Sequence, residues 1–279
     1  METTSKTSPK DFFLWLGAII ALYGSITSFI ALLFEYINYS FPDALAGYSD
    51  PYGGAVRFAM ASLIVLVPAL IVLFRFIRSS ISAEAGKANL WVRRWAIVLT
   101  LFIAAITILI DLITLINIFL GGEISVRFGL KVAVVLLVAV GVFVHFLADQ
   151  KGYWILNPKK ANLVGIAVGV LALVSVISGF FIIGTPNDVR MLRYDETKVQ
   201  DLSNMQYQVL NYWQLKRTLP TEAAQLVDSL GGYSLPTDPQ AKVPYTYRAT
   251  GPLTFELCAS FNKPTPDTAG KGADPARDI

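Results

Sequence analysis

The sequence predicts an α-helical membrane bundle of five transmembrane helices, followed by a small extracytoplasmic α+β domain. Three observations support this fold class. The 279 residues are 54% apolar and only 15% charged, and the mean hydropathy is +0.54. The apolar residues gather in five runs of about 23 residues, each long enough to cross a hydrocarbon core of ~30 Å. From Gly184 onward the composition is close to that of a soluble domain, with ten Lys/Arg and eleven Asp/Glu.

The five runs are predicted to be helices because a bilayer offers no water to unpaired backbone groups, and the runs are too long for barrel strands. They cover residues 12–34, 55–77, 95–120, 126–148 and 161–183. Residues 1–11 are then a tail, 12–160 a four-helix domain and 161–183 a fifth span. The first run is too long for a signal peptide and lacks a small-x-small site before Glu35, so we expect it to be retained.

Basic residues predict the orientation of the bundle. The N-terminal tail, the second loop and the fourth loop hold ten of them: Lys6, Lys10, Arg75, Arg78, Lys87, Arg93, Arg94, Lys151, Lys159 and Lys160. The first loop, residues 35–54, holds none, and the third turn contributes only Arg127. We therefore expect a cytoplasmic N terminus and an extracytoplasmic domain at residues 184–261.

In this domain a long helix is predicted to start at Thr185, which can cap it, and to end near Lys216. A short helical turn is expected over residues 222–230. Strands are expected over 244–248 and 253–261, joined by a turn at 249–252. In the second strand, alternation places Phe255, Leu257, Ala259 and Phe261 on one face, which would pack on the helix. Residues 262–279 are rich in Pro, Gly, Asp and Lys and are predicted to be disordered.

Several motifs in the first four spans resemble a known family. They are Phe41-Pro42-Asp43, Arg57, the run from Arg94 to Phe102, Asp111-Leu112, the run from Phe119 to Glu123, Arg127-Phe128 and Leu130-Lys131. The sequence here resembles a bacterial membrane family catalogued as domain of unknown function 5671. The resemblance implies a bacterial inner (cytoplasmic) membrane protein and brings no activity with it.

A second resemblance lies in the C-terminal domain. It is carried by Asp201-Leu202, Tyr212, Leu219-Pro220, Gly232-Tyr233, Asp238-Pro239, Tyr245, Tyr247 and Phe255-Glu256-Leu257. These residues are similar to the soluble domain of type II secretion pseudopilins, in which a membrane helix leads into a small hairpin domain. Because no prepilin peptidase motif precedes the fifth run, the resemblance implies the shape of the domain and not assembly into a fibre.

Charged residues inside or beside the apolar runs are the candidate site, since ionisable groups in a membrane are costly. They are Arg57, Asp111, Glu123, Arg127 and Lys131. If the third and fourth spans form an antiparallel hairpin, Lys131 can reach Asp111. Two interpretations remain open: an ion-pair network that locks the helices together, or a relay or pocket for an ion or polar ligand.

Other candidate sites have simpler explanations. Gly165 and Gly169 form a G-x-x-x-G motif, which predicts a close helix contact within the chain or in a dimer. The single His145 and the single Cys258 exclude a two-histidine metal site and a disulfide. Some pseudopilins hold calcium near the position of Asp238, but Asp228 and the nearby carbonyls do not supply six to eight oxygens. We therefore predict no metal, no cofactor and no enzyme activity.

These features favour a non-enzymatic membrane anchor or scaffold that presents a small interaction domain on the outer face of the cell. The alternative is a small transporter or ion-coupled channel that uses Asp111, Lys131 and Arg57. The expected partners are the lipid bilayer and an envelope protein, or a second copy bound through the C-terminal domain or the fifth helix. The basic loops suit membrane topology and anionic lipids rather than nucleic acid.

Overall fold

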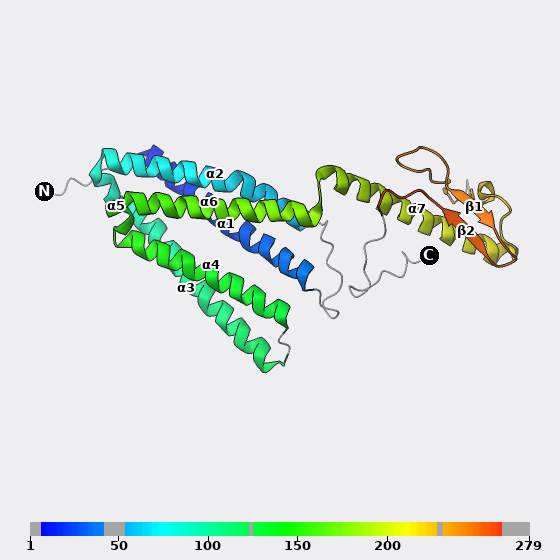
Figure 1. The fold of residues 1–279 in the computed structure, drawn as a ribbon, viewed down its shortest axis with the longest axis horizontal. Coiled ribbons are helices and arrows are strands. Elements are labelled where there is room, and N and C mark those ends of the chain that lie inside the picture. The colour runs from blue at the N-terminus through cyan, green and yellow to red at the C-terminus, as the bar shows by residue number, and fades with distance from the viewer. Residues whose placement is uncertain (1–6, 42–53, 123–124, 228–230, 264–279) are drawn as a thin grey trace. The chain divides into compact units, whose positions relative to one another are not determined.

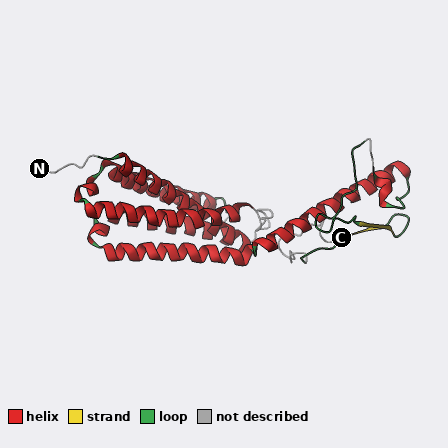
Figure 2. Ribbon diagram, turned by 90° about the horizontal axis from the view of Figure 1, so that it is seen from above, coloured by secondary structure: helices red, strands yellow, loops and turns green. Residues whose placement is uncertain are grey.

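The computed structural model describes residues 7–41, 54–122, 125–227 and 231–263. The chain forms two compact units, Met1–Ile183 and Gly184–Ile279. In its described part the first unit is helical, and the second combines a long helix with a two-stranded sheet (Figures 1 and 2).

Within the described residues, five helices are long and apolar enough to cross a membrane, as predicted. Four of them are α1 (Pro9–Ser40), α2 (Gly54–Ala83), α3 (Trp91–Leu120) and α4 (Val126–Gln150), and the apolar part of the fifth is α6 (Pro158–Ile183). Each helix extends beyond the apolar run that predicted it. The reason is that polar residues at the ends continue the backbone hydrogen-bond pattern, whereas hydropathy detects only the apolar centre.

The start of α1 is set by a hydrogen-bonded cap. The Ser8 hydroxyl accepts a hydrogen bond from the Asp11 backbone N–H at 3.2 Å, and the Asp11 carboxylate accepts from the Ser8 hydroxyl at 2.7 Å. This capping box, with Pro9 in the first turn, starts the helix at Pro9. Residues 9–11 therefore belong to α1, which begins three residues before the apolar run predicted over 12–34.

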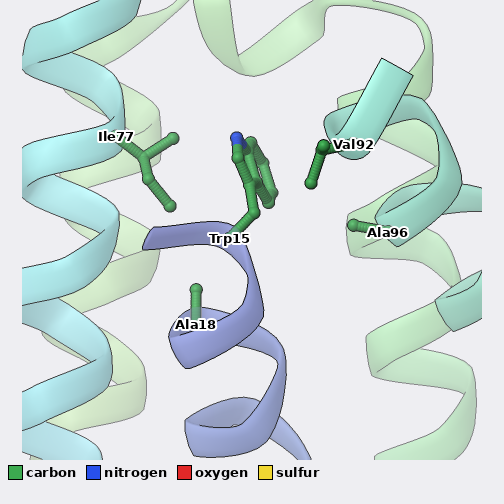
Figure 3. Packing of buried hydrophobic residues seen from close by; sticks show 5 residues of the cluster. All are labelled: Trp15, Ala18, Ile77, Val92 and Ala96. Carbon is green, nitrogen blue, oxygen red and sulfur yellow. The ribbon is translucent and has the colours of Figure 1, made fainter. Parts of the chain in front are cut away.

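Helix α1 contacts each of the other four long helices of the first unit. Helices α3 and α4 pack along each other as a hairpin, and α6 packs against α2 (Figure 1). A buried cluster joins the first turns of α1 to the end of α2 and the start of α3; it contains Trp15, Ala18, Ile77, Val92 and Ala96 (Figure 3). The N-terminal end of α1 therefore lies beside the connection between α2 and α3.

Large apolar side chains cover the outside of the first unit. Phe181 is 87% exposed, Leu120 78% and Phe58 75%. Apolar area left in water costs about 25 cal/mol per Å², so a soluble protein rarely exposes large contiguous apolar patches. This surface is compatible with a protein that lies in lipid.

Two short elements in the loops lie outside the predictions. The 3₁₀ helix η1 (Ala85–Asn89) connects α2 to α3, and α5 (Tyr153–Leu156) connects α4 to α6. Gly152 has φ = 72°, a left-handed conformation that lets the chain turn between α4 and α5. Neither element is long enough to show helical periodicity in the sequence.

In the second unit, α7 (Pro186–Lys216) begins and ends as predicted. Thr185 and Asp188 form a capping box, and Arg217 ends the helix in a left-handed conformation. The expected short helical turn is the 3₁₀ helix η2 (Ala223–Leu226). The rest of the predicted turn, residues 228–230, lies outside the described residues.

The predicted hairpin is present but shorter than expected. Strands β1 (Thr246–Ala249) and β2 (Phe255–Cys258) pair antiparallel, with Thr246 opposite Cys258 and Ala249 opposite Phe255. Phe255, Leu257 and Ala259 are half-buried and alternate with exposed residues, and β2 contacts α7. Phe261 differs from the prediction: it is 46% exposed, because regular pairing ends at Cys258.

Candidate functional site

Two of the predicted site residues, Arg127 and Lys131, face the C-terminal end of α1. The Arg127 Nε donates a 2.9 Å hydrogen bond to Asn38 Oδ1, and the Lys131 ammonium lies 5.3 Å from the centre of the Phe34 ring. These contacts join α4 to α1 through one hydrogen bond to an amide and one cation–π contact with an aromatic ring.

Asn38 and Phe34 were not predicted as members of this site, although the sequence contains a signal for them. Arg127 and Lys131 are four residues apart, and so are Phe34 and Asn38. Residues at this spacing share one helix face, so two such pairs match when the helices run antiparallel. This matched spacing identifies the site only once the packing of α4 on α1 is known.

Asp111 is separated from these cations. It is 9% exposed, and its Oδ2 atom is buried without a hydrogen-bond partner among the described residues. Within the same residues, no ion pair within 4.0 Å joins Asp111 to Lys131. The predicted cluster is therefore divided: the basic residues contact α1, and Asp111 stays alone on α3.

The position of Asp111 follows from the packing of α3 on α4. The buried residues of α3 include Ile97, Ala104 and Asp111, and those of α4 are Val132, Ala139 and Phe146, with a spacing of seven in both helices. This spacing is typical of a coiled-coil seam. In an antiparallel hairpin it places Asp111 at the level of Val132, about 13 Å from the end of α3 at Leu120.

The other two residues of the predicted cluster add little to it. Arg57 is half-buried in the first turn of α2, and the part of the chain that is described offers it no ion-pair partner. Glu123 lies outside the described residues.

The G-x-x-x-G motif does not mark the closest helix contact. A Cβ atom at Gly165 would have no atom within 4 Å, and one at Gly169 would meet only Ile71 at an ordinary 3.5 Å. At Gly179, in contrast, a Cβ would lie 2.6 Å from Met60 Sδ and 2.9 Å from Tyr36 Oη. The Tyr36 hydroxyl also donates a short hydrogen bond to the Ser175 carbonyl, so α6 meets α1 and α2 at Ser175 and Gly179.

The opposite end of the bundle holds a buried ion pair. Arg93 is 8% exposed, and its guanidinium lies 2.9 Å from Asp149 Oδ1. Nearby, the Trp154 indole donates a 2.9 Å hydrogen bond to the His145 carbonyl and stacks on the His145 ring at 4.9 Å. Lys87 pairs with Asp11 at 3.5 Å. These contacts bring together the start of α1, the α2–α3 connection and the end of α4.

Two cavities in the first unit have volumes of only about 10 Å³ each. Such a volume is about the minimum for one water molecule. One is lined by residues around Asp11 and Lys87, and the other by residues around Trp15 and Phe146. Neither is lined by Asp111, Arg57 or Lys131.

The second unit contains a buried charge network around α7. Asp195 is 7% exposed and accepts hydrogen bonds from the backbone N–H groups of Asn262 and Lys263 and from the Asn262 amide, at 2.8–3.0 Å. Asn262 and Lys263 are thus held on α7 and are not disordered, contrary to the prediction for residues 262–279. The remainder of that segment, residues 264–279, lies outside the described chain.

Asp238 forms the other side of this network. Its Oδ1 accepts hydrogen bonds from the Gln240 and Ala241 backbone N–H groups at 2.7 and 2.9 Å, and its Oδ2 lies 3.3 Å from the Lys198 ammonium. Burial opposes ionisation, but these donors together hold the pKa of Asp238 below its ordinary value. The Lys198 ammonium occupies the side of the Asp238 carboxylate that a calcium ion would have to approach. A positive charge at this position does not fit a calcium site.

Tyrosine hydroxyls complete the packing of this unit. Tyr245 donates a 2.8 Å hydrogen bond to Asp201 on α7, and Tyr247 donates a 2.8 Å bond to the Pro220 carbonyl. Burial, followed by the bond to Asp201, raises the pKa of Tyr245. Both bonds attach the hairpin region to α7 or to the chain just after it.

A comparison with protein families finds one match. Residues 11–146 match the family model described as Domain of unknown function (DUF5671). The chain is similar to this family over α1, α2, α3 and nearly all of α4, which confirms the first resemblance. The match does not extend to α6 or the second unit, and the pseudopilin resemblance has no support from any match. No curated protein and no solved structure matches the chain.

Proposed function

We propose that the protein is a non-enzymatic anchor in the bacterial cytoplasmic membrane, which presents its C-terminal domain on the outer face for interaction with another envelope protein. The observation that carries this proposal is the course of α6. The helix starts beside Arg78, which donates to Asn162 in its first turns, and it ends at Ile183 at the opposite end of the bundle. The second unit therefore follows the bundle at the end opposite to Arg78, Lys87 and Arg93.

The distribution of charge supports the orientation. Ion pairs and hydrogen bonds of Lys87, Arg93 and Arg78 gather the predicted cytoplasmic segments at one end. Basic residues are retained on the cytoplasmic side of membrane proteins. With five spans, residue 184 and the chain after it lie on the outer side.

The surface of α7 supports an interaction role. Tyr207 is 62% exposed, Leu210 46% and Leu215 83%, near the C-terminal end of the helix. Exposed aromatic and aliphatic side chains of this kind are suited to a protein partner. The likeness to pseudopilin soluble domains, in which a small hairpin domain follows a membrane helix, is consistent with the same role.

The native Cys258 gives a direct test of the orientation, because it is exposed and is the single cysteine of the chain. A membrane-impermeant maleimide applied to intact spheroplasts should label wild-type protein at Cys258. In a Cys258→Ser background, a cysteine placed at exposed Lys151 should react only after lysis. Labelling of Lys151→Cys in intact spheroplasts, together with labelling of wild-type Cys258 only after lysis, would contradict the proposed orientation.

Cross-linking in cells tests the interaction role. A photo-reactive cross-linker attached to Cys258 of the full-length protein should give one discrete adduct with an envelope protein. Tyr207→Ser and Leu210→Ser should remove the adduct, whereas Gln200→Ser, another exposed position on α7, should not. An adduct that survives both substitutions, or no adduct at all, would count against this role.

The alternative function is transport of an ion, and the buried, unpaired Oδ2 of Asp111 favours it. A transporter would depend on that carboxylate, so Asp111→Asn would remove its cellular phenotype without loss of the folded protein. An anchor would retain function in the same variant. Since neither of the two cavities described above is lined by Asp111, we prefer the anchor.

A further inference from the structure

A cluster of hydrogen-bond donors lies where α2 ends, α5 turns and α6 begins. Arg78 Nη1 donates a 3.2 Å hydrogen bond to Asn162 Oδ1. A guanidinium can only donate, so the amide must present its oxygen to Arg78. Both N–H groups of the Asn162 amide are therefore directed away from Arg78, and no acceptor for them is found among the residues that the structure describes.

Lys159 adds a positive charge on the same side of α6. It is exposed and precedes Asn162 by three residues, a spacing that places two side chains on one helix face. Within the described part of the chain, neither Arg78 nor Lys159 has a carboxylate within 4.0 Å. We call Arg78, Lys159 and Asn162 the donor cluster.

The surroundings of the donor cluster are also basic. The carboxylate whose charge acts on Arg78 is that of Asp149, and it is already paired with Arg93 at 2.9 Å. Lys160 donates to the Tyr153 hydroxyl at 2.9 Å, so its partner is also neutral. A group rich in acceptors and negatively charged would satisfy these donors.

Helix α5 places an apolar surface beside the cluster. Trp154 is fixed on His145, and Tyr153 packs edge-on against Trp154 at 5.0 Å. Ile155 is 45% exposed and Leu156 79%. Trp and Tyr are enriched where headgroups meet acyl chains, and the cluster lies at the end of two membrane helices. At the surface of a membrane, phosphate groups are supplied by phospholipid headgroups.

We propose that Arg78, Lys159 and Asn162 bind the phosphate group of an anionic phospholipid, with Ile155 and Leu156 beside its acyl chains. The site does not depend on the anchor function, since any protein with this bundle would retain it. It differs from the general attraction of basic loops to an anionic membrane because it requires a neutral residue, Asn162, as a donor.

The decisive variant is Asn162→Asp in the full-length protein. A carboxylate there can still accept the hydrogen bond from Arg78, and an acidic residue near a helix N-terminus is favourable, so the bundle should fold. It would, however, replace the amide donors with a negative charge that repels phosphate. Arg78→Gln removes the guanidinium. Arg94→Gln is the matched control, because Arg94 is exposed at the same end and outside the cluster.

Binding is measured by native mass spectrometry of the protein in neutral detergent, titrated with dioleoyl phosphatidylglycerol or dioleoyl phosphatidylcholine. The wild type should retain phosphatidylglycerol in preference to phosphatidylcholine. Asn162→Asp and Arg78→Gln should each weaken phosphatidylglycerol binding about tenfold, and Arg94→Gln should change it less than about threefold.

Two results would overturn the proposal. The first is equal loss in Arg94→Gln and Asn162→Asp, which would indicate diffuse attraction to charge. The second comes from titration with inorganic phosphate: if it displaces phosphatidylglycerol from the wild type at matched concentration, the site binds a free anion rather than a lipid. Retention of the lipid against inorganic phosphate, with loss in Asn162→Asp, supports the lipid site.

Discussion

The ammonium of Lys198 donates a 2.6 Å hydrogen bond to the backbone carbonyl of Ser260, and this bond ties α7 to the segment after β2. The same ammonium lies 3.3 Å from Asp238 Oδ2 and 3.9 Å from Asp195 Oδ1. The Lys198 side chain is only 3% exposed. A buried charge is tolerated when it is both paired and hydrogen-bonded, so one cation holds three segments of the domain together.

Lys198→Met should therefore destabilise the second unit. The substitution retains the length of the side chain but leaves two buried carboxylates without their cation, which costs about 3 kcal/mol. Hydrogen exchange of residues 186–263 in the full-length protein measures this loss as faster exchange. Lys216→Met at an exposed site of the same helix is the control and should change stability by less than about 0.5 kcal/mol. Equal exchange in the two variants would contradict the role of Lys198.

Asp238 should make the stability of this unit depend on pH. Its pKa is lowered in the folded state, so its contribution is present above the unfolded pKa of about 3.9 and is lost as pH falls through the folded pKa. Asp238→Asn should be less stable than the wild type at pH 7, and the difference should shrink below pH 4. Hydrogen exchange or thermal unfolding at a series of pH values follows the difference. A constant difference from pH 7 to pH 2 would show that ionised Asp238 is not the stabilising form.

Three helices start at a residue whose side chain caps the helix, Ser8, Ser125 and Thr185, and the sequence analysis predicts the cap at Thr185. Ser8-Pro9-Lys10-Asp11 and Thr185-Pro186-Asn187-Asp188 have the same pattern, and both form capping boxes. Hydropathy alone places the start of the first helix at Phe12, where the apolar run begins, and so does not detect the cap at Ser8. Local hydrogen bonding, and not burial in the membrane, decides where α1 starts.

The charge contacts were harder to predict, because they depend on which helices pack together. In α7, Asp195 and Lys198 continue the buried face of Leu202, Met205 and Val209, and a polar residue on that face implies a partner. The partners, Asp238 and Ser260, lie more than 35 residues away in the chain. In the bundle, the Lys131 ammonium contacts Phe34 on α1 and not Asp111 on α3. Sequence spacing within the α3–α4 hairpin could not predict this contact, because the partner lies on a third helix.

Gly179 should be more sensitive to substitution than Gly165 in the same helix. In Gly179→Ala the new methyl group would meet the buried Met60 sulfur at 2.6 Å and the Tyr36 hydroxyl at 2.9 Å, so the side chains must move. Overpacking of this kind costs about 1–2 kcal/mol. Gly165→Ala meets no atom within 4 Å and should leave stability unchanged or raise it by about 0.5–1 kcal/mol through helix propensity. Titration of the detergent-solubilised protein with dodecyl sulfate, followed by circular dichroism, compares the unfolding free energies of the two variants. A greater loss of stability in Gly165→Ala than in Gly179→Ala would refute the close contact of α6 with Met60 and Tyr36.

Asp111 should lower, and not raise, the stability of the bundle. Its buried Oδ2 has no partner among the described residues, and an unsatisfied buried polar atom costs about 1–3 kcal/mol. Asp111→Val replaces the carboxyl with an apolar group of similar size and should raise the unfolding free energy by about 1 kcal/mol in the same dodecyl sulfate titration. Asp111→Asn keeps a polar group at the site and should lie within about 0.5 kcal/mol of the wild type. A loss of more than about 2 kcal/mol in Asp111→Val would mean that the carboxyl has a stabilising partner, and Asp111 would then be part of the packing after all.

If Asp111→Val is as stable as expected but loses its cellular phenotype, the carboxyl is retained for function, and the transport alternative becomes the better explanation.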